Sequence, residues 1–64
     1  MQVVLKGKTR KGKTRIGMHG PLWTVVQVNM EPRPDEMLVR SQDGRDLRWI
    51  HPTADPNFMI VETP

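Results

Sequence analysis

Residues 22–28 read Leu-Trp-Thr-Val-Val-Gln-Val, the most convincing strand signal in this chain of 64 residues. β-Branched and aromatic side chains suit a pleated sheet, so we expect a strand here. Similar short runs predict further strands at 2–5, 14–18, 37–41, 46–50 and 58–62. Asp43-Gly44 predicts a tight hairpin between 37–41 and 46–50, because Gly tolerates a positive φ.

Two proline-containing segments separate these runs. Residues 29–36 contain Pro32 and Pro34 and are expected to form a loop, because proline cannot donate to a strand ladder. Residues 51–56 also contain two prolines and predict a turn, with up to one turn of 3₁₀ helix. No segment shows a sustained helical period. We therefore expect an all-β fold, with five or six strands that form a meander and curl into a small barrel.

The interior of this barrel is expected to come from apolar residues spread over the predicted strands. Val25 and Val26 are adjacent, so the buried face of 22–28 is open to a register shift of one residue. The predicted interior residues are Ile16, Leu22, Val26, Val28, Met37, Val39, Leu47, Trp49, Phe58 and Ile60.

This order of strands and turns resembles the SH3-like small barrels, including the KOW and Tudor-type modules. The resemblance covers residues 13–62, and Gly20-Pro21-Leu22-Trp23 is similar to the glycine-containing loop of KOW modules. It implies one domain, 1–64, with a barrel body at 14–62 and a basic N-terminal arm or hairpin at 6–15. The small size and the lack of an enzyme signature also resemble accessory proteins of phages and other mobile elements.

The plasmid-borne type II dihydrofolate reductases are SH3-like barrels of similar length and offer an enzymatic alternative. Their active pore carries a Val-Gln-Ile-Tyr strand. The corresponding stretch here, Leu47-Arg48-Trp49-Ile50, lacks the Gln and the Tyr. This mismatch argues against reductase activity, because function depends on the site and not on the fold.

Residues 6–15 consist of the pentapeptide Lys-Gly-Lys-Thr-Arg repeated in tandem. The repeat holds six of the ten Lys and Arg residues and no acid, whereas the whole chain has a net charge of only +3. This asymmetry points to a polyanionic partner. The two glycines would let the backbone approach phosphates closely. The alternative is a solvated segment without a fixed partner. The candidate phosphate-binding residues are Lys6, Lys8, Arg10, Lys11, Lys13 and Arg15.

Residues 7–14 also match the P-loop pattern of two glycines followed by Lys and Thr. A P-loop must open a helix whose first amides face the phosphates. Gly17, Gly20 and Pro21 follow soon after and are not expected to sustain a helix. We therefore interpret the match as a by-product of the repeat.

Aromatic and arginine side chains complete the candidate site. Trp23 follows a Gly-Pro turn and is expected to form an exposed stacking platform, whereas Trp49 is expected in the core. Arg48 is a further candidate contact. Alternatively Arg40, Arg45 and Arg48 pair with Asp43 and Asp46 across the hairpin, which is the reading we favour.

Other chemistry has little support in the sequence. There is no cysteine, no histidine spacing typical of a metal site, and no base near Ser41, the sole serine. His19 and His51 are expected to be exposed. We expect no enzyme activity, metal or cofactor. Residues 1–5 are too short for the apolar region of a signal peptide, and no apolar run reaches the roughly 20 residues of a membrane span, so we expect a cytoplasmic protein.

These observations predict a non-enzymatic nucleic-acid-binding module of weak specificity, for DNA or RNA. If about five cations meet duplex phosphates, the logarithm of affinity should fall with the logarithm of salt at a slope near −4 to −5. The alternative is a protein-interaction module, either an inhibitor or an adaptor of a larger protein. Either would be a monomer or a small homo-oligomer, and no membrane partner is expected.

Overall fold

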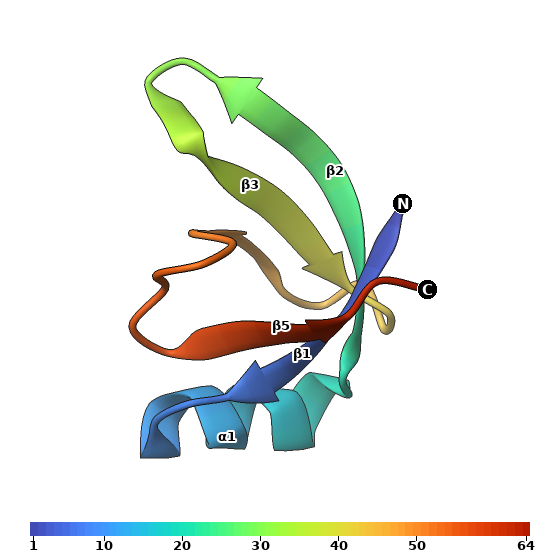
Figure 1. Cartoon of the computed structure of the whole chain (residues 1–64). Coiled ribbons are helices and arrows are strands. Elements are labelled where there is room, and N and C mark those ends of the chain that lie inside the picture. Colours follow the sequence, from blue (N-terminus) through green and yellow to red (C-terminus); the bar gives the residue numbers. More distant parts are fainter.

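Five strands form one antiparallel sheet in the order β4-β3-β2-β1-β5 (Figure 1). The computed structural model describes all residues, 1–64. The elements in chain order are β1 (Gln2–Gly7), α1 (Arg10–His19), β2 (Leu22–Met30), β3 (Arg33–Ser41), β4 (Leu47–Ile50) and β5 (Phe58–Glu62). The fold is therefore mostly β, and no pairing joins β4 to β5, so the sheet is open.

Two predicted segments have a different structure. Residues 14–18, expected as a strand, belong to α1, so the all-β prediction is wrong by one helix. Residues 29–36, expected as a loop, are mostly strand, and only Glu31 and Pro32 connect β2 to β3. Pro34 is tolerated in β3 because it lies where the register with β2 shifts.

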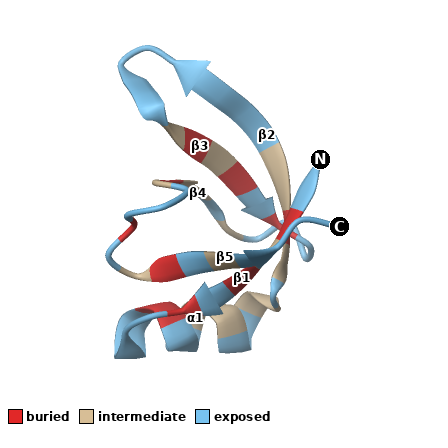
Figure 2. Ribbon diagram, in the orientation of Figure 1, coloured by how far each residue is buried: buried red, intermediate tan, exposed pale blue.

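The concave face of the sheet carries the core (Figure 2). Direct cross-strand partners lie on the same face, and the pairs Val3–Trp23 and Met37–Ile50 are buried together. Ile16 of α1 packs against this core. The buried apolar residues are Val3, Leu5, Trp23, Met37, Val39, Ile50 and Phe58.

A bulge in β2 settles which valine faces the core. Val25 pairs with Val39 and Gln27 pairs with Leu38, so Val26 is left without a partner. Val25 packs against the core and Val26 is exposed, so the prediction of Val26 as interior is wrong. Beyond the bulge Val28 is also exposed, again contrary to the prediction, because the β2–β3 hairpin extends past the other strands (Figure 1).

The face of β4 is opposite to the one expected. Ile50 pairs with buried Met37, which places Leu47 and Trp49 on the outer face. Leu47 is exposed and Trp49 is half-buried, so neither belongs to the core. Of the other predicted interior residues, Met37, Val39 and Phe58 are buried, Ile16 and Ile60 pack against the core, and Leu22 is half-buried.

The turn between β4 and β5 is organised by one buried carboxylate. Asp55 accepts hydrogen bonds from the backbone N–H groups of His51, Asn57 and Phe58, at 3.2, 2.9 and 3.1 Å. These bonds satisfy donors that would otherwise have no partner in a segment with two prolines. The predicted turn at 51–56 is confirmed, without a 3₁₀ helix.

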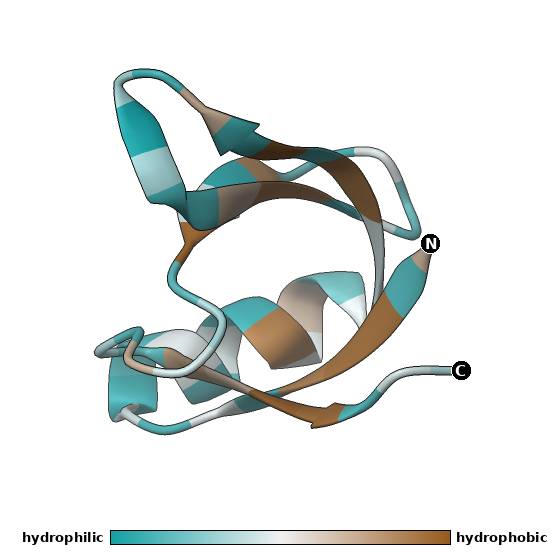
Figure 3. Ribbon diagram, turned by 45° about the horizontal axis from the view of Figure 1, so that its top comes forward, coloured by the Kyte–Doolittle hydropathy of each residue, from teal (hydrophilic) through white to brown (hydrophobic).

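The curled sheet and α1 lie against each other at β1 (Figure 3). The helix is largely hydrophilic in this view, with an apolar stretch in its middle. This matches its half-buried Ile16. The one helix, α1, is too short and too polar to cross a membrane.

Candidate polyanion-binding surface

The two copies of Lys-Gly-Lys-Thr-Arg have different structures. Residues 6–10 form the end of β1, a two-residue connection and the first residue of α1, whereas residues 11–15 are entirely helical. The predicted arm or hairpin at 6–15 is therefore wrong. Four of the six cations lie on the helix and form what we call the basic helix face, namely Arg10, Lys11, Lys13 and Arg15.

Thr9 of the first copy sets the start of the helix. As the N-cap residue, its Oγ1 accepts a hydrogen bond from the N–H of Gly12 at 3.1 Å. The same hydroxyl donates to Oδ1 of Asn57 at 2.8 Å, and the N–H of Lys8 donates to the Asn57 carbonyl at 2.8 Å. The beginning of α1 is thus attached to the segment that leads into β5.

The glycines of the repeat permit close packing of the helix on the strand. A Cβ on Gly12 would overlap the carbonyl of Asn57, and a Cβ on Gly7 would overlap the backbone nitrogen of Lys13. Both glycines are buried. Their small size is therefore used inside the protein, whereas we had expected it to serve contact with phosphates.

The end of the helix is attached to the β3–β4 turn. Gly20, at φ 86°, ends α1 and donates its N–H to the Ile16 carbonyl at 2.7 Å. Nδ1 of His19 lies 2.9 Å from Oδ2 of Asp43, and Nε2 lies 4.0 Å from Oδ2 of Asp46. His19 is only 9% exposed at its side chain, so the expectation of an exposed histidine is wrong.

Asp43 is held in its charged form by its neighbours. The Ser41 hydroxyl donates to it at 2.5 Å and the Arg45 backbone N–H at 3.0 Å. These hydrogen bonds, followed by the one from His19, keep the pKa of Asp43 well below its usual range. Ser41 is buried and also accepts from the N–H of Asp46, so its role is structural.

None of the repeat's cations is neutralised by a carboxylate. The four ion pairs of the structure involve only His19, Arg33 and Arg48 as cations. The first turn of α1 contains no acid, so its cations lie at the positive end of the helix dipole. Free amides at the helix start add to this positive potential. Such an arrangement is unfavourable for the isolated helix and favourable for a bound anion.

Lys6 and Lys8 lie apart from the basic helix face. Lys6 is opposite Met59 in the β1–β5 pairing, on the face of β1 away from Gly7 and α1. Nζ of Lys8 donates to the Asp55 carbonyl at 2.8 Å. The structure therefore does not bring the six predicted cations together on one surface, although it gathers four of them.

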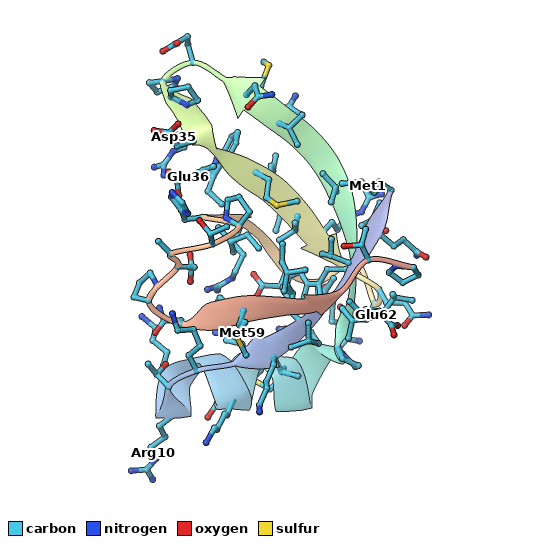
Figure 4. All side chains as sticks on the ribbon, viewed as in Figure 1. Met1, Arg10, Asp35, Glu36, Met59 and Glu62 are labelled. Carbon is cyan, nitrogen blue, oxygen red and sulfur yellow. The ribbon has the colours of Figure 1, made fainter.

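Three of the seven acidic residues lie in the β2–β3 hairpin, at the end of the molecule opposite to α1. Asp35 and Glu36 lie near the β2–β3 tip, and Arg10 points away beneath α1 (Figure 4). Glu31 is in the turn of the same hairpin, and Glu36 pairs with Arg33 at 3.0 Å. With three acids and one arginine, the β2–β3 tip thus carries a net negative charge at a distance from the basic helix face.

Trp23 is not a stacking platform. It is fully buried, with its Nε1 donating to the Gly20 carbonyl at 2.9 Å. Its ring lies edge-on to His19 and tilted against Phe58, at centroid distances of 6.3 and 6.5 Å. The expectation of an exposed Trp23 is wrong, because this residue anchors α1 to the sheet.

Arg48 also has an internal role. Its Nε donates to Oδ2 of Asp46 at 3.1 Å, and its guanidinium lies 5.3 Å from the centre of the Phe58 ring. The favoured pairing of Arg48 with Asp46 is confirmed. Arg40 and Arg45 are exposed and form no ion pair, so the pairing prediction does not hold for them.

Trp49 is the tryptophan that faces outward. It lies beside Leu38 on the outer face, and the guanidinium of Arg33 is 5.7 Å from its ring centre. The signal that could have found it is the pairing of Ile50 with Met37, which fixes the opposite face for residue 49.

The P-loop match fails, although not for the reason expected. A strand does precede it and a helix does follow, so the expectation that the glycines prevent a helix is wrong. However, α1 begins inside the match at Arg10, and the Gly12 amide is bonded to Thr9. No loop is left to surround a phosphate. No group of three or more potential metal ligands is present.

Comparison with protein families, curated proteins and solved structures found no match to this chain.

Proposed function

We propose that this chain is a non-enzymatic nucleic-acid-binding module that contacts phosphates through the basic helix face. The observation that carries the proposal is a helix with four cations that have no carboxylate partner. Lys and Arg side chains that neutralise phosphates release counterions, which supplies most of the affinity of non-specific binding. No residue set typical of base readout accompanies them, so the binding is of weak sequence specificity.

We also propose that the curled sheet is an SH3-like barrel that remains open between β4 and β5. Support comes from the strand order, in which β1 lies between β2 and β5 and a short turn separates β4 from β5. That arrangement resembles the SH3-like meander. Within it, the sheet is the platform and α1, inserted between the first two strands, is the binding element.

The direct test is a matched pair of charge variants. In one, Arg10, Lys11, Lys13 and Arg15 become Gln, which has a similar helix propensity. In the control, Lys6, Arg33, Arg40 and Arg45 become Gln, so the net charge falls equally. Binding to a labelled nucleic acid of mixed sequence is measured by fluorescence anisotropy at about 50 mM salt, where counterion release favours it.

The helix variant is expected to lose at least about tenfold in affinity and the control less than about threefold, because only the first removes phosphate contacts. Equal losses would mean that net charge alone governs binding. An unmodified chain that does not bind DNA or RNA at low salt would remove the proposal. Circular dichroism of both variants checks that the fold is retained.

A second candidate function is protein interaction, and the outer face of β3 and β4 favours it. Leu38, Leu47 and Trp49 lie together there beside Arg40, which has no ion-pair partner. Trp and Arg are typical of interface hot spots. By charge complementarity, the partner would be a protein that presents an apolar surface with a carboxylate among its side chains.

Two substitutions test this alternative. The unmodified chain is expected to retain one identified partner protein from nuclease-treated extracts, and Trp49→Ala or Arg40→Glu should each abolish this retention. Arg45 is also exposed, and Arg45→Glu should leave the retention unchanged. Retention that persists in both variants would contradict the assignment. So would a concentration-dependent dimer that Trp49→Ala dissociates, because the face would then serve a second copy.

A further inference from the structure

No tryptophan or phenylalanine ring is available for base stacking near the basic helix face. Trp23 and Phe58 are buried, at 0% and 4% exposure. Trp49 is on the outer face of β4 under Arg33. The ring of His19 is held between Asp43 and Trp23. Proteins that bind single strands combine a basic groove with aromatic rings on which bases stack, and this surface lacks the second part.

The basic helix face is convex and lies on a helix that is held at both ends. Both ends of α1 are attached, the first through Thr9 and Asn57 and the second through His19 and Asp43. The ten helical residues span about 15 Å. A major groove about 12 Å wide admits an α-helix of this kind. Thr14 follows Arg10 by four residues and Gly17 follows Lys13 by four, so each lies next to a cation on the helix surface. Thr14 and Gly17 are small and lie in the middle of the exposed side.

A duplex presents a higher density of phosphate charge to the basic helix face than a single strand does. Duplex DNA carries a negative charge about every 1.7 Å along its axis, twice the density of one strand. Each phosphate neutralised on a duplex also contributes about −0.9 to the salt slope, compared with about −0.7 on a single strand. A cation cluster that cannot stack bases therefore gains its affinity from charge density.

We propose that the nucleic acid bound by this chain is a duplex, held through its phosphate backbone by α1 without base stacking. The inference rests on the proposed function and adds its substrate class. Four contacts on the duplex correspond to a slope of about −3.6. The same contacts on a single strand correspond to about −2.8.

The test compares a mixed-sequence duplex of about 20 base pairs with oligo-dT of equal length, at equal phosphate concentration and over about 50 to 300 mM salt. The duplex is expected to bind about tenfold more tightly at the low end. The tryptophan fluorescence should stay unchanged with either ligand, because Trp23 is buried and Trp49 is remote from α1.

A gain-of-function variant tests whether the lack of an aromatic ring explains the preference for a duplex. Thr14→Tyr places a ring in the middle of the basic helix face and should raise the affinity for oligo-dT about fivefold, the value of one modest stacking contact. Equal or tighter binding of oligo-dT by the unmodified chain would overturn the inference and leave the proposed function intact. No gain from Thr14→Tyr would also overturn it. Failure to bind either ligand would remove both.

Discussion

The same five residues, Lys-Gly-Lys-Thr-Arg, end a strand in one copy and build a helix in the next. In the first copy Gly7 closes β1 and Thr9 caps the helix. In the second copy Gly12 packs against Asn57, and Thr14 donates back to the Arg10 carbonyl at 2.9 Å. Local sequence therefore does not decide these structures. What differs is the neighbour, a sheet partner for the first copy and the core side of the sheet for the second.

Substitution of the two buried glycines, one in each copy, is expected to have the largest effect on stability. Gly12→Ala should cost about 3 kcal/mol or more in the free energy of unfolding, because the new methyl group meets backbone that cannot move aside. Gly7→Ala should cost a similar amount, since the two glycines face each other.

Gly17→Ala is the matched control within the same helix. Nothing lies within contact distance of its Cβ, so it should stabilise the fold by about 0.5–1 kcal/mol through helix propensity. Urea unfolding measures all three variants. A Gly12→Ala protein as stable as the unmodified chain would show that α1 does not pack against Asn57 and Gly7 as described.

The threonines give a smaller and more selective effect. Thr9→Ala removes the N-cap and the bond to Asn57, and should cost about 1 kcal/mol. Thr14→Ala removes only an exposed bond within the helix and should change stability by less than about 0.5 kcal/mol. Thermal unfolding of the two variants side by side checks this. Equal costs would mean that the first copy does not cap the second.

The smallest effect concerns the far end of the helix and depends on pH. The depressed pKa of Asp43 means that its contribution to stability is complete above its unfolded pKa of about 3.9 and is lost as pH falls further. Asp43→Asn should therefore destabilise the protein at pH 6 and destabilise it by a smaller amount near pH 2, where part of the contribution of Asp43 has been lost. Unfolding curves measured across this range test the sign, and a variant whose deficit grows in acid would contradict it.

The strands were largely predictable, and the helix was not. β-Branched and aromatic runs indicated β2, β3, β4 and β5, and Asp43-Gly44 indicated the turn between β3 and β4. The helix has two glycines and one apolar residue that contacts the core, so neither propensity nor period reveals it. Its stability comes from the packing of Gly7 on Gly12 and from the Thr9 cap, which are tertiary contacts.

The candidate site was predictable in charge and not in geometry. The repeat shows six cations, but only the strand–helix boundary reveals that Lys6 lies on another face. For a similar reason the sequence predicted the opposite placement of the two tryptophans, with Trp23 exposed and Trp49 in the core. The pairing of Trp23 with buried Val3 and the pairing of Trp49 with Leu38 set which ring faces inward, and neither pairing is written in the local composition.

The repeat itself supplies the most direct test of the central claim, that the helical copy binds the polyanion. One variant changes Lys6, Lys8 and Arg10 to Gln and the other changes Lys11, Lys13 and Arg15, so composition and charge are identical. Salt-dependent binding to a duplex should lose about 0.9 from its slope in the first variant, where only Arg10 is on the helix, and about 2.7 in the second. Equal losses in the two variants would contradict the account, because they would describe a flexible basic segment instead of a helix.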